Sequence, residues 1–130
     1  MVKKVLVADD DDLIRDDYIK RIKRWANDVE VDVLVDEVSN GASLVDKVKS
    51  GSYSLIIADD KMPVSLYDDG ISGFEAIKLI REFDESTPIY MIARGNANQE
   101  ALRLGANGYI NKNETGFIKQ FQAVILKYLV

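Results

Sequence analysis

The sequence contains no histidine and no cysteine. Their absence excludes histidine general bases, thiolate nucleophiles, serine-histidine triads and zinc sites built from these two residue types. Carboxylates, lysines, hydroxyl groups and the backbone remain to do chemistry. Basic residues are also fewer than acidic ones, 17 against 22, so the net charge of -5 gives no support for a nucleic-acid surface and favours cations as ligands.

Long apolar runs are lacking as well. No uncharged apolar stretch approaches the roughly 18 residues that a membrane-spanning helix needs. The stretch from Val5 to Ala8, which follows two lysines, is too short for the core of a signal peptide. We therefore expect a cytoplasmic protein with no membrane partner. At 130 residues, of which 47% are hydrophobic, we expect one domain over residues 1–130, standing alone without an output domain.

Short apolar runs alternate with segments of helical periodicity. Five runs predict strands: Val5 to Ala8, Val31 to Val35, Leu55 to Ala58, Ile89 to Ala93, and Tyr109 with Ile110. Helical spacing relates three sets of apolar residues: Ile14, Tyr18, Ile22 and Trp25; Phe74, Ile77, Ile80 and Phe83; and Phe117, Phe121, Val124 and Tyr128. Shorter helices are expected at Ala42 to Lys49 and Asn98 to Leu104. The alternation predicts an α/β fold with a doubly wound, five-stranded parallel sheet covered by helices on both faces.

Charged residues follow three of the predicted strands. Asp9 and Asp10 follow the first strand, Asp59 and Asp60 the third, and Lys112 the fifth. In a doubly wound sheet of strand order 2-1-3-4-5, ligands bind outside the carboxyl ends, where the first and third strands are neighbours. Asp9, Asp10 and Asp59 would then share one pocket, and their mutual repulsion favours a bound divalent cation. Hard oxygen ligands with room for water suit Mg²⁺ best.

Each of these residues, taken alone, also has an ordinary structural explanation. Aspartates after a strand are common helix N-caps, and Asp12 is the expected N-cap of the first long helix. Asp59 with Asp60 is compatible with a turn, and Lys112 with a surface lysine. The segment from Lys61 to Ser72 is expected to be a long loop, either functional or a tolerated surface insertion.

Four segments form a more specific combination. They are Lys4 to Asp10, Leu55 to Asp59 followed by Lys61-Met62-Pro63, Gly73-Phe74-Glu75, and Gly105 to Lys112. Together these segments resemble the receiver domain of bacterial two-component response regulators. The resemblance covers essentially the whole chain and implies a flavodoxin-like (βα)5 fold.

The resemblance also implies a function and roles for single residues. Asp59 would be the phosphoacceptor, taking a phosphoryl group from a histidine kinase or phosphotransfer protein, and Lys112 would pair with a phosphoryl oxygen. Mg²⁺ would be held by Asp10, Asp59 and the backbone carbonyl of Lys61, with Asp9 helping through water. The domain would assist its own phosphorylation and dephosphorylation without being an enzyme, and would signal to a downstream protein target.

The chain departs from the family pattern in its second half. Ala93 stands where the family carries Ser or Thr, and Arg94 stands where a small residue is usual. Asn113 replaces the proline that normally follows the lysine, here Lys112. Tyr109 corresponds to the aromatic switch residue of the family. Because Ala93 leaves room beside it, we expect the Tyr109 ring to lie inward even without phosphate.

These departures keep other functions open. One alternative is a phosphorylation-independent pseudo-receiver that acts as a protein-interaction module. Another is a flavodoxin-like binder of small molecules, which is disfavoured because no Ser/Thr/Gly-rich phosphate loop follows the first predicted strand.

Overall fold

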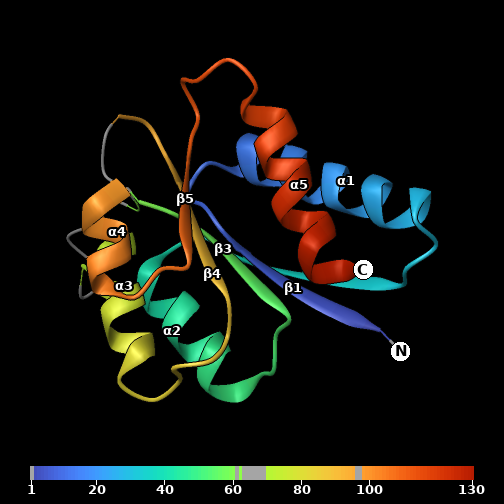
Figure 1. Cartoon of the computed structure of the whole chain (residues 1–130). Helices are drawn as coiled ribbons and strands as arrows, with labels where there is room; N and C mark the ends of the chain where they lie inside the picture. Colours follow the sequence, from blue (N-terminus) through green and yellow to red (C-terminus); the bar gives the residue numbers. More distant parts are fainter. Residues whose placement is uncertain (1, 61, 63–69, 96–97) are drawn as a thin grey trace.

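A parallel sheet separates two layers of helices (Figure 1). The structure is a computed structural model that describes residues 2–60, 62, 70–95 and 98–130. The five strands are all parallel, in the order β2-β1-β3-β4-β5. Their bounds are β1 Lys3–Ala8, β2 Val33–Val38, β3 Leu55–Asp59, β4 Ile89–Ala93 and β5 Gly108–Asn111. The fold class and the strand order predicted from the sequence are confirmed.

The helices divide unequally between the two faces of the sheet. Helices α1 (Asp12–Asp28) and α5 (Phe117–Leu129) cover one face, and α2 (Gly41–Ser50), α3 (Gly73–Arg81) and α4 (Asn98–Leu104) cover the other. No described helix combines the length and apolar character needed to cross a membrane.

Each face of the sheet carries its own hydrophobic core. Successive strand side chains point to opposite faces, so Val7 lies in the core under α1 and α5, and Ala8 lies in the core under the other three helices. Phe121 of α5 is fully buried in the first core, where its ring makes edge contacts with Tyr18 and Trp25 of α1 at centroid distances of 5.1 and 5.4 Å. These contacts hold α1 and α5 together on this face of the sheet.

The position of β2 differs from the expectation of residues 31–35. The strand begins at Val33 and continues to Val38 because its register follows β1, from Lys3 opposite Val33 to Ala8 opposite Val38. β2 is an edge strand, and its one neighbour in the sheet is β1. Charged side chains are common on edge strands, so Asp36 and Glu37 do not interrupt the pairing with β1. The apolar run in the sequence ends at Val35, before these two residues.

The expected apolar stripe of α3 also ends early. The helix stops at Arg81, and Phe83 lies beyond it with 44% of its surface exposed, under the ammonium group of Lys49 at 5.6 Å. Arg81 donates to the carbonyls of Gly105 and Asp84 at 2.9 and 3.0 Å. This clasp joins the end of α3 to the segment before β5, and the chain turns away into β4 before another helical turn forms.

Candidate functional site

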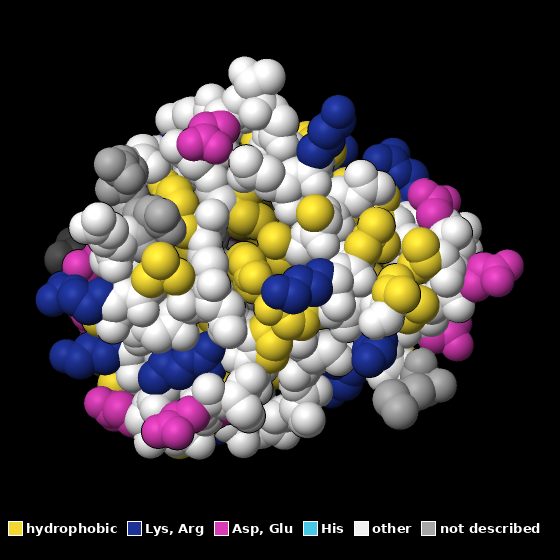
Figure 2. Space-filling model, in the orientation of Figure 1, with side chains coloured by type: hydrophobic (Ala, Val, Ile, Leu, Met, Phe, Trp, Pro, Cys, Tyr) yellow, Lys and Arg dark blue, Asp and Glu magenta, His cyan; other side chains and the backbone are white. Residues whose placement is uncertain are grey.

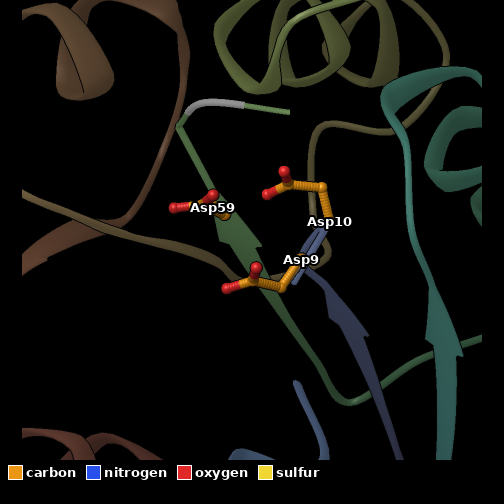
Figure 3. Close-up of side chains that lie close together, drawn as sticks. All are labelled: Asp9, Asp10 and Asp59. Atoms are coloured by element: carbon orange, nitrogen blue, oxygen red, sulfur yellow. The ribbon is translucent and has the colours of Figure 1, made fainter. Parts of the chain in front are cut away.

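Three carboxylates meet at the carboxyl ends of β1 and β3. The two strands pair side by side, with Ala8 opposite Ala58, so the aspartates that follow these alanines lie at the same level. One oxygen from each of Asp9, Asp10 and Asp59 lies within 4.8 Å of the others. Figure 3 shows the three side chains projecting to the same side of the strands. Asp9 and Asp59 are buried and Asp10 is exposed, so the cluster has a closed floor and an open side.

Lys112 supplies the positive charge of the cluster. It follows β5, and its Nζ donates to Asp59 Oδ1 at 3.1 Å and lies 4.0 Å from Asp9 Oδ2. Its side chain is only 16% exposed, so the alternative of a surface lysine is wrong. The peptide bond after Lys112 is trans, since none of the described residues has a cis bond.

The buried carboxylate of Asp9 provides a test of whether a cation fits the site. Its Oδ1 accepts a hydrogen bond from the backbone N–H of Asp11 at 2.9 Å, but its buried Oδ2 has no hydrogen-bond partner within the described part of the chain. A buried oxygen without a donor is unfavourable, and a hard cation would satisfy it. The donor set therefore fits Mg²⁺. The carbonyl of Lys61, expected as a further ligand, lies outside the described residues.

The electrostatics of the cluster also favour a cation. Burial, reinforced by the charge of Asp9, raises the pKa of Asp59 from 3.8 to about 7, and the nearby Lys112 offsets this only in part. Burial raises the pKa of Asp9 as well. One lysine is thus too little positive charge for two buried carboxylates and a third beside them. A divalent cation would displace the protons and restore the ionised forms.

The turn between β1 and α1 is held by a residue that the sequence analysis missed. Arg15 donates to the Asp9 carbonyl at 2.8 Å, to Glu37 Oε1 at 2.8 Å and to Asp12 Oδ1 at 2.7 Å, and its side chain is 12% exposed. The guanidinium group therefore ties α1 and the end of β2 to the backbone between the first two site aspartates. An arginine one turn into a helix that follows an acidic pair is the signal that could have indicated this role.

The N-cap of α1 is Asp11, and the prediction of Asp12 is wrong. Asp11 Oδ1 accepts from the backbone N–H groups of Leu13 and Ile14 at 2.9 and 3.1 Å. Four consecutive aspartates offer several possible caps, and the tertiary contacts of the turn choose among them. Asp12 is the first residue of the helix, where its carboxylate pairs with Arg15 instead.

The start of α3 lies directly against the end of β3. The backbone N–H of Gly73 donates to the carbonyl of Asp60 at 3.2 Å, and a Cβ at position 73 would come within 2.1 Å of the Asp59 carbonyl. Only glycine permits this approach. Ser72 caps the helix by accepting from the N–H of Glu75 at 3.1 Å. Of the expected loop before it, residues 61 and 63–69 lie outside the described residues.

The comparisons with known proteins agree with this geometry. The model of the response regulator receiver domain family matches residues 5–120. The chain belongs to this family. The resemblance seen in the sequence is therefore confirmed for the receiver domain as a whole.

Relatives of this receiver domain include much longer proteins. The transcription factor prr1 of Schizosaccharomyces pombe is 30% identical over 128 residues, which are 98% of this chain and 21% of the relative. The uncharacterized transcriptional regulatory protein YkoG of Bacillus subtilis is 30% identical over 76 residues, 56% of this chain and 31% of the relative. The chain thus spans about a fifth to a third of the length of these curated relatives.

A solved structure matches the receiver domain over nearly its whole length. The response regulator TrrA of Thermotoga maritima, solved in complex with Mg²⁺ and BeF, is 25% identical over 98% of this chain and 99% of its own, with a TM-score of 0.78. A magnesium ion and a beryllium fluoride are thus present in a structural relative of this receiver domain.

The end of β4 completes the site of this receiver domain. Ala93 is fully buried, and the next residue, Arg94, lines an open pocket of about 210 Å³ together with Asp59, Asp60 and Lys112. Tyr109 is half-buried, and its hydroxyl donates to the carbonyl of Gly95 and lies 3.5 Å from that of Ala93. The Tyr109 ring therefore reaches from β5 across to the end of β4.

Proposed function

We propose that this chain is a phosphoacceptor whose Asp59 receives a phosphoryl group from a histidine kinase or phosphotransfer protein in a reaction that requires Mg²⁺. One observation carries the proposal. The buried Asp59 carboxylate is hydrogen-bonded to Lys112 and shares an oxygen cluster with Asp9 and Asp10. Phosphoryl transfer depends mainly on positioning and charge neutralisation, and this cluster supplies both without a histidine of its own.

Phosphoryl transfer to Asp59 exchanges one bond to phosphorus for another, and the acceptor and the donor supply both bonding partners. An Asp59 carboxylate oxygen attacks phosphorus in line as the phosphorus–nitrogen bond of the donor phosphohistidine breaks. The electron pair of that bond stays on the imidazole, which takes a proton from solvent. Hydrolysis later breaks the bond between phosphorus and Asp59 and releases inorganic phosphate. Because Asp59 must be ionised to attack, its raised pKa needs the opposing charge of a cation.

The chain's own residues divide the remaining work. Asp9, Asp10 and Asp59 would hold Mg²⁺, which neutralises charge on the phosphoryl oxygens when bound. Lys112 Nζ lies 3.1 Å from Asp59 Oδ1. From this position it can bind an oxygen of a phosphoryl group carried by Asp59. The exposed Asp10 leaves the outer side of the cluster open to the donor. The domain is a stoichiometric acceptor, so we propose that it is not itself an enzyme.

Intact-mass spectrometry after incubation with acetyl phosphate tests the proposal. We expect one added phosphoryl group with Mg²⁺ present, none with EDTA, and none in Asp59→Asn. Asp60→Asn is the matched control, since Asp60 neighbours the acceptor and lines the same pocket, and it should still be labelled. Phosphorylation at Asp60 would contradict the assignment of the acceptor, and no labelling of the wild type would contradict the proposed function.

A second candidate is an interaction module that works without phosphorylation. Leu102 of α4 and Ile118 of α5 are large hydrophobic residues with 46% and 37% of their surface exposed. Figure 2 shows hydrophobic side chains gathered with basic ones on the face where β5 lies between α4 and α5. We infer that a downstream cytoplasmic protein binds this face in either case. Unlabelled wild-type protein in the acetyl phosphate experiment would favour the phosphorylation-independent function.

A further inference from the structure

The open pocket beside Asp59 contains a second cation in addition to Lys112. The pocket of about 210 Å³ is lined by two carboxylates, Asp59 and Asp60, and by two cations, Arg94 and Lys112. Lys112 is already hydrogen-bonded to Asp59. Arg94 makes no hydrogen bond or ion pair within the part of the chain that the structure describes. None of its five N–H donors is engaged by a described residue, so these donors can serve a ligand in the pocket.

The register of the sheet explains why Arg94 lies on the side of Asp59. Ile92 pairs with Asp59 in the ladder between β4 and β3 and packs into the core under α1 and α5. Ala93 faces the opposite core and offers only a methyl group. Arg94 follows as the next residue on the side of Ile92 and Asp59, in keeping with the alternation of a strand. It is thus the residue through which the end of β4 supplies hydrogen-bond donors to the pocket.

The charge of Arg94 acts at the same place as the charges of the site carboxylates. Tyr18 is a buried residue of α1, and its pKa is raised first by burial and then by the charges of Asp9 and Asp59. Arg94 works in the opposite direction on the same hydroxyl. Arg94 and the site carboxylates thus influence the same side chain with opposite sign, and Arg94 itself is exposed.

We propose that Arg94 is an anion ligand that binds an oxygen of the phosphoryl group on Asp59, opposite Lys112. This inference rests on the proposed function, because it concerns the phosphorylated state of that same site. Phosphorylation adds negative charge and new acceptor oxygens to a pocket whose two cations are Arg94 and Lys112, the latter already bonded to Asp59. An arginine fork suits phosphoryl oxygens in both charge and geometry, and it replaces a donor that Ala93 cannot supply.

The test is a titration of the Mg²⁺-loaded protein with beryllium trifluoride as the phosphoryl probe. We expect Arg94→Ala to weaken the beryllium trifluoride complex by tenfold or more, and Arg94→Lys to fall between this variant and the wild type. Arg24→Ala is the matched control, because Arg24 is an exposed arginine of α1. Its affinity should equal that of the wild type.

A titration with Mg²⁺ alone separates this role from a purely structural one. Removing a cation from the pocket that contains Asp59 and Asp60 should leave Mg²⁺ binding unchanged or make it tighter in Arg94→Ala, while the beryllium trifluoride complex weakens. Equal weakening of both would overturn the inference, as would a beryllium trifluoride affinity in Arg94→Ala that matches the wild type. In those outcomes the proposed function stands. A wild type that binds no beryllium trifluoride would overturn the proposed function, and this inference with it.

Discussion

Asp59 is the residue on which opposing electrostatic effects meet. Burial and the neighbouring Asp9 favour its protonated form, whereas the hydrogen bond from Lys112 favours the ionised form. Without a metal the first two effects dominate. The site is therefore under electrostatic strain that a divalent cation relieves, and this strain has consequences for stability that can be measured with purified protein.

Millimolar Mg²⁺ should stabilise the protein, and Asp10→Asn should lose most of this effect. A ligand that binds only the folded state at ten times its Kd adds about 1.4 kcal/mol to the free energy of unfolding. Thermal melting with and without Mg²⁺ measures the shift in Tm. Asp16→Asn is the control, because Asp16 is a surface residue paired with Lys20, and it should respond like the wild type. An unmoved wild-type melting curve would show that the metal site is wrongly assigned.

The metal-free protein should lose stability as the pH rises from about 4 to about 7. Because the pKa of Asp59 rises from 3.8 to about 7 on folding, the native state holds a proton in this window that the unfolded state has released. Asp59→Asn removes this penalty, so it should be more stable than the wild type above pH 7, by roughly 2 to 4 kcal/mol, with little difference near pH 4. Urea unfolding in EDTA across this range measures the effect, and parallel profiles for the two proteins would contradict it.

At the scale of elements, the turn from β1 into α1 sets the position of the acidic pair. Asp9 accepts from the N–H of Asp11, Asp11 caps α1, and Arg15 of the first helical turn donates back to the Asp9 carbonyl. Glu37 fixes the guanidinium group from the end of β2. Strand, turn, helix and edge strand are thus joined through one side chain.

Arg15→Lys should weaken Mg²⁺ binding several-fold and lower the free energy of unfolding by about 1 to 2 kcal/mol. Lysine keeps the positive charge but cannot donate to three acceptors in fixed directions, so the Asp9–Asp10 backbone loses a support. Calorimetric titration with Mg²⁺ and urea unfolding measure the two effects. Arg21→Lys is the control, because within the described part of the chain Arg21 pairs with Asp17 of its own helix. An unchanged Mg²⁺ affinity in Arg15→Lys would show that the contact is not needed to position the metal ligands.

At the scale of the whole molecule, the question is how an event at Asp59 reaches the face formed by α4, β5 and α5. Tyr109 connects the two regions, since its ring lies beside the core under α3 and α4 and its hydroxyl contacts the carbonyl of Gly95. Ala93 and Met91 belong to the same core, and Met91 pairs with Tyr109 in the ladder. A side chain with a hydroxyl at position 93 would therefore face the same core as the Tyr109 ring, one residue beyond the strand partner of Asp59.

Ala93→Thr should enlarge the response of Tyr109 to Mg²⁺ with beryllium trifluoride. A charge-assisted hydrogen bond from the new hydroxyl is worth roughly 1.5 to 3 kcal/mol, comparable to a typical allosteric coupling of about 1 to 3 kcal/mol. Amide chemical shifts around Tyr109 in the free and bound proteins measure the response. Ala93→Val, which adds similar bulk without a hydroxyl, is the control. Equal responses in the wild type and Ala93→Thr would refute the coupling, and a large ring movement in the wild type would refute an inward Tyr109 in the free protein.

Much of the fold and most of the cluster could be predicted from the sequence. The limits of β4 and α4 coincide with the predicted ones, Ile89–Ala93 and Asn98–Leu104. In each of these short segments the residue pattern and the observed structure agree. Alternating strands and helices imply a parallel sheet, and a parallel sheet brings residues that follow its strands to one edge. Asp9, Asp10, Asp59 and Lys112 could be grouped in this way without knowledge of any contact.

Tertiary structure alone decided the remaining features, each of which depends on contacts between distant segments. The extent of β2 follows its pairing with β1. The choice of Asp11 as N-cap and the three contacts of Arg15 depend on where the turn after β1 meets the end of β2. Phe83 is exposed beyond the end of α3, where Arg81 is hydrogen-bonded to the carbonyl of Gly105. Periodicity in a sequence records which residues are buried, whereas hydrogen bonds between elements depend on distances that exist only after the chain has folded.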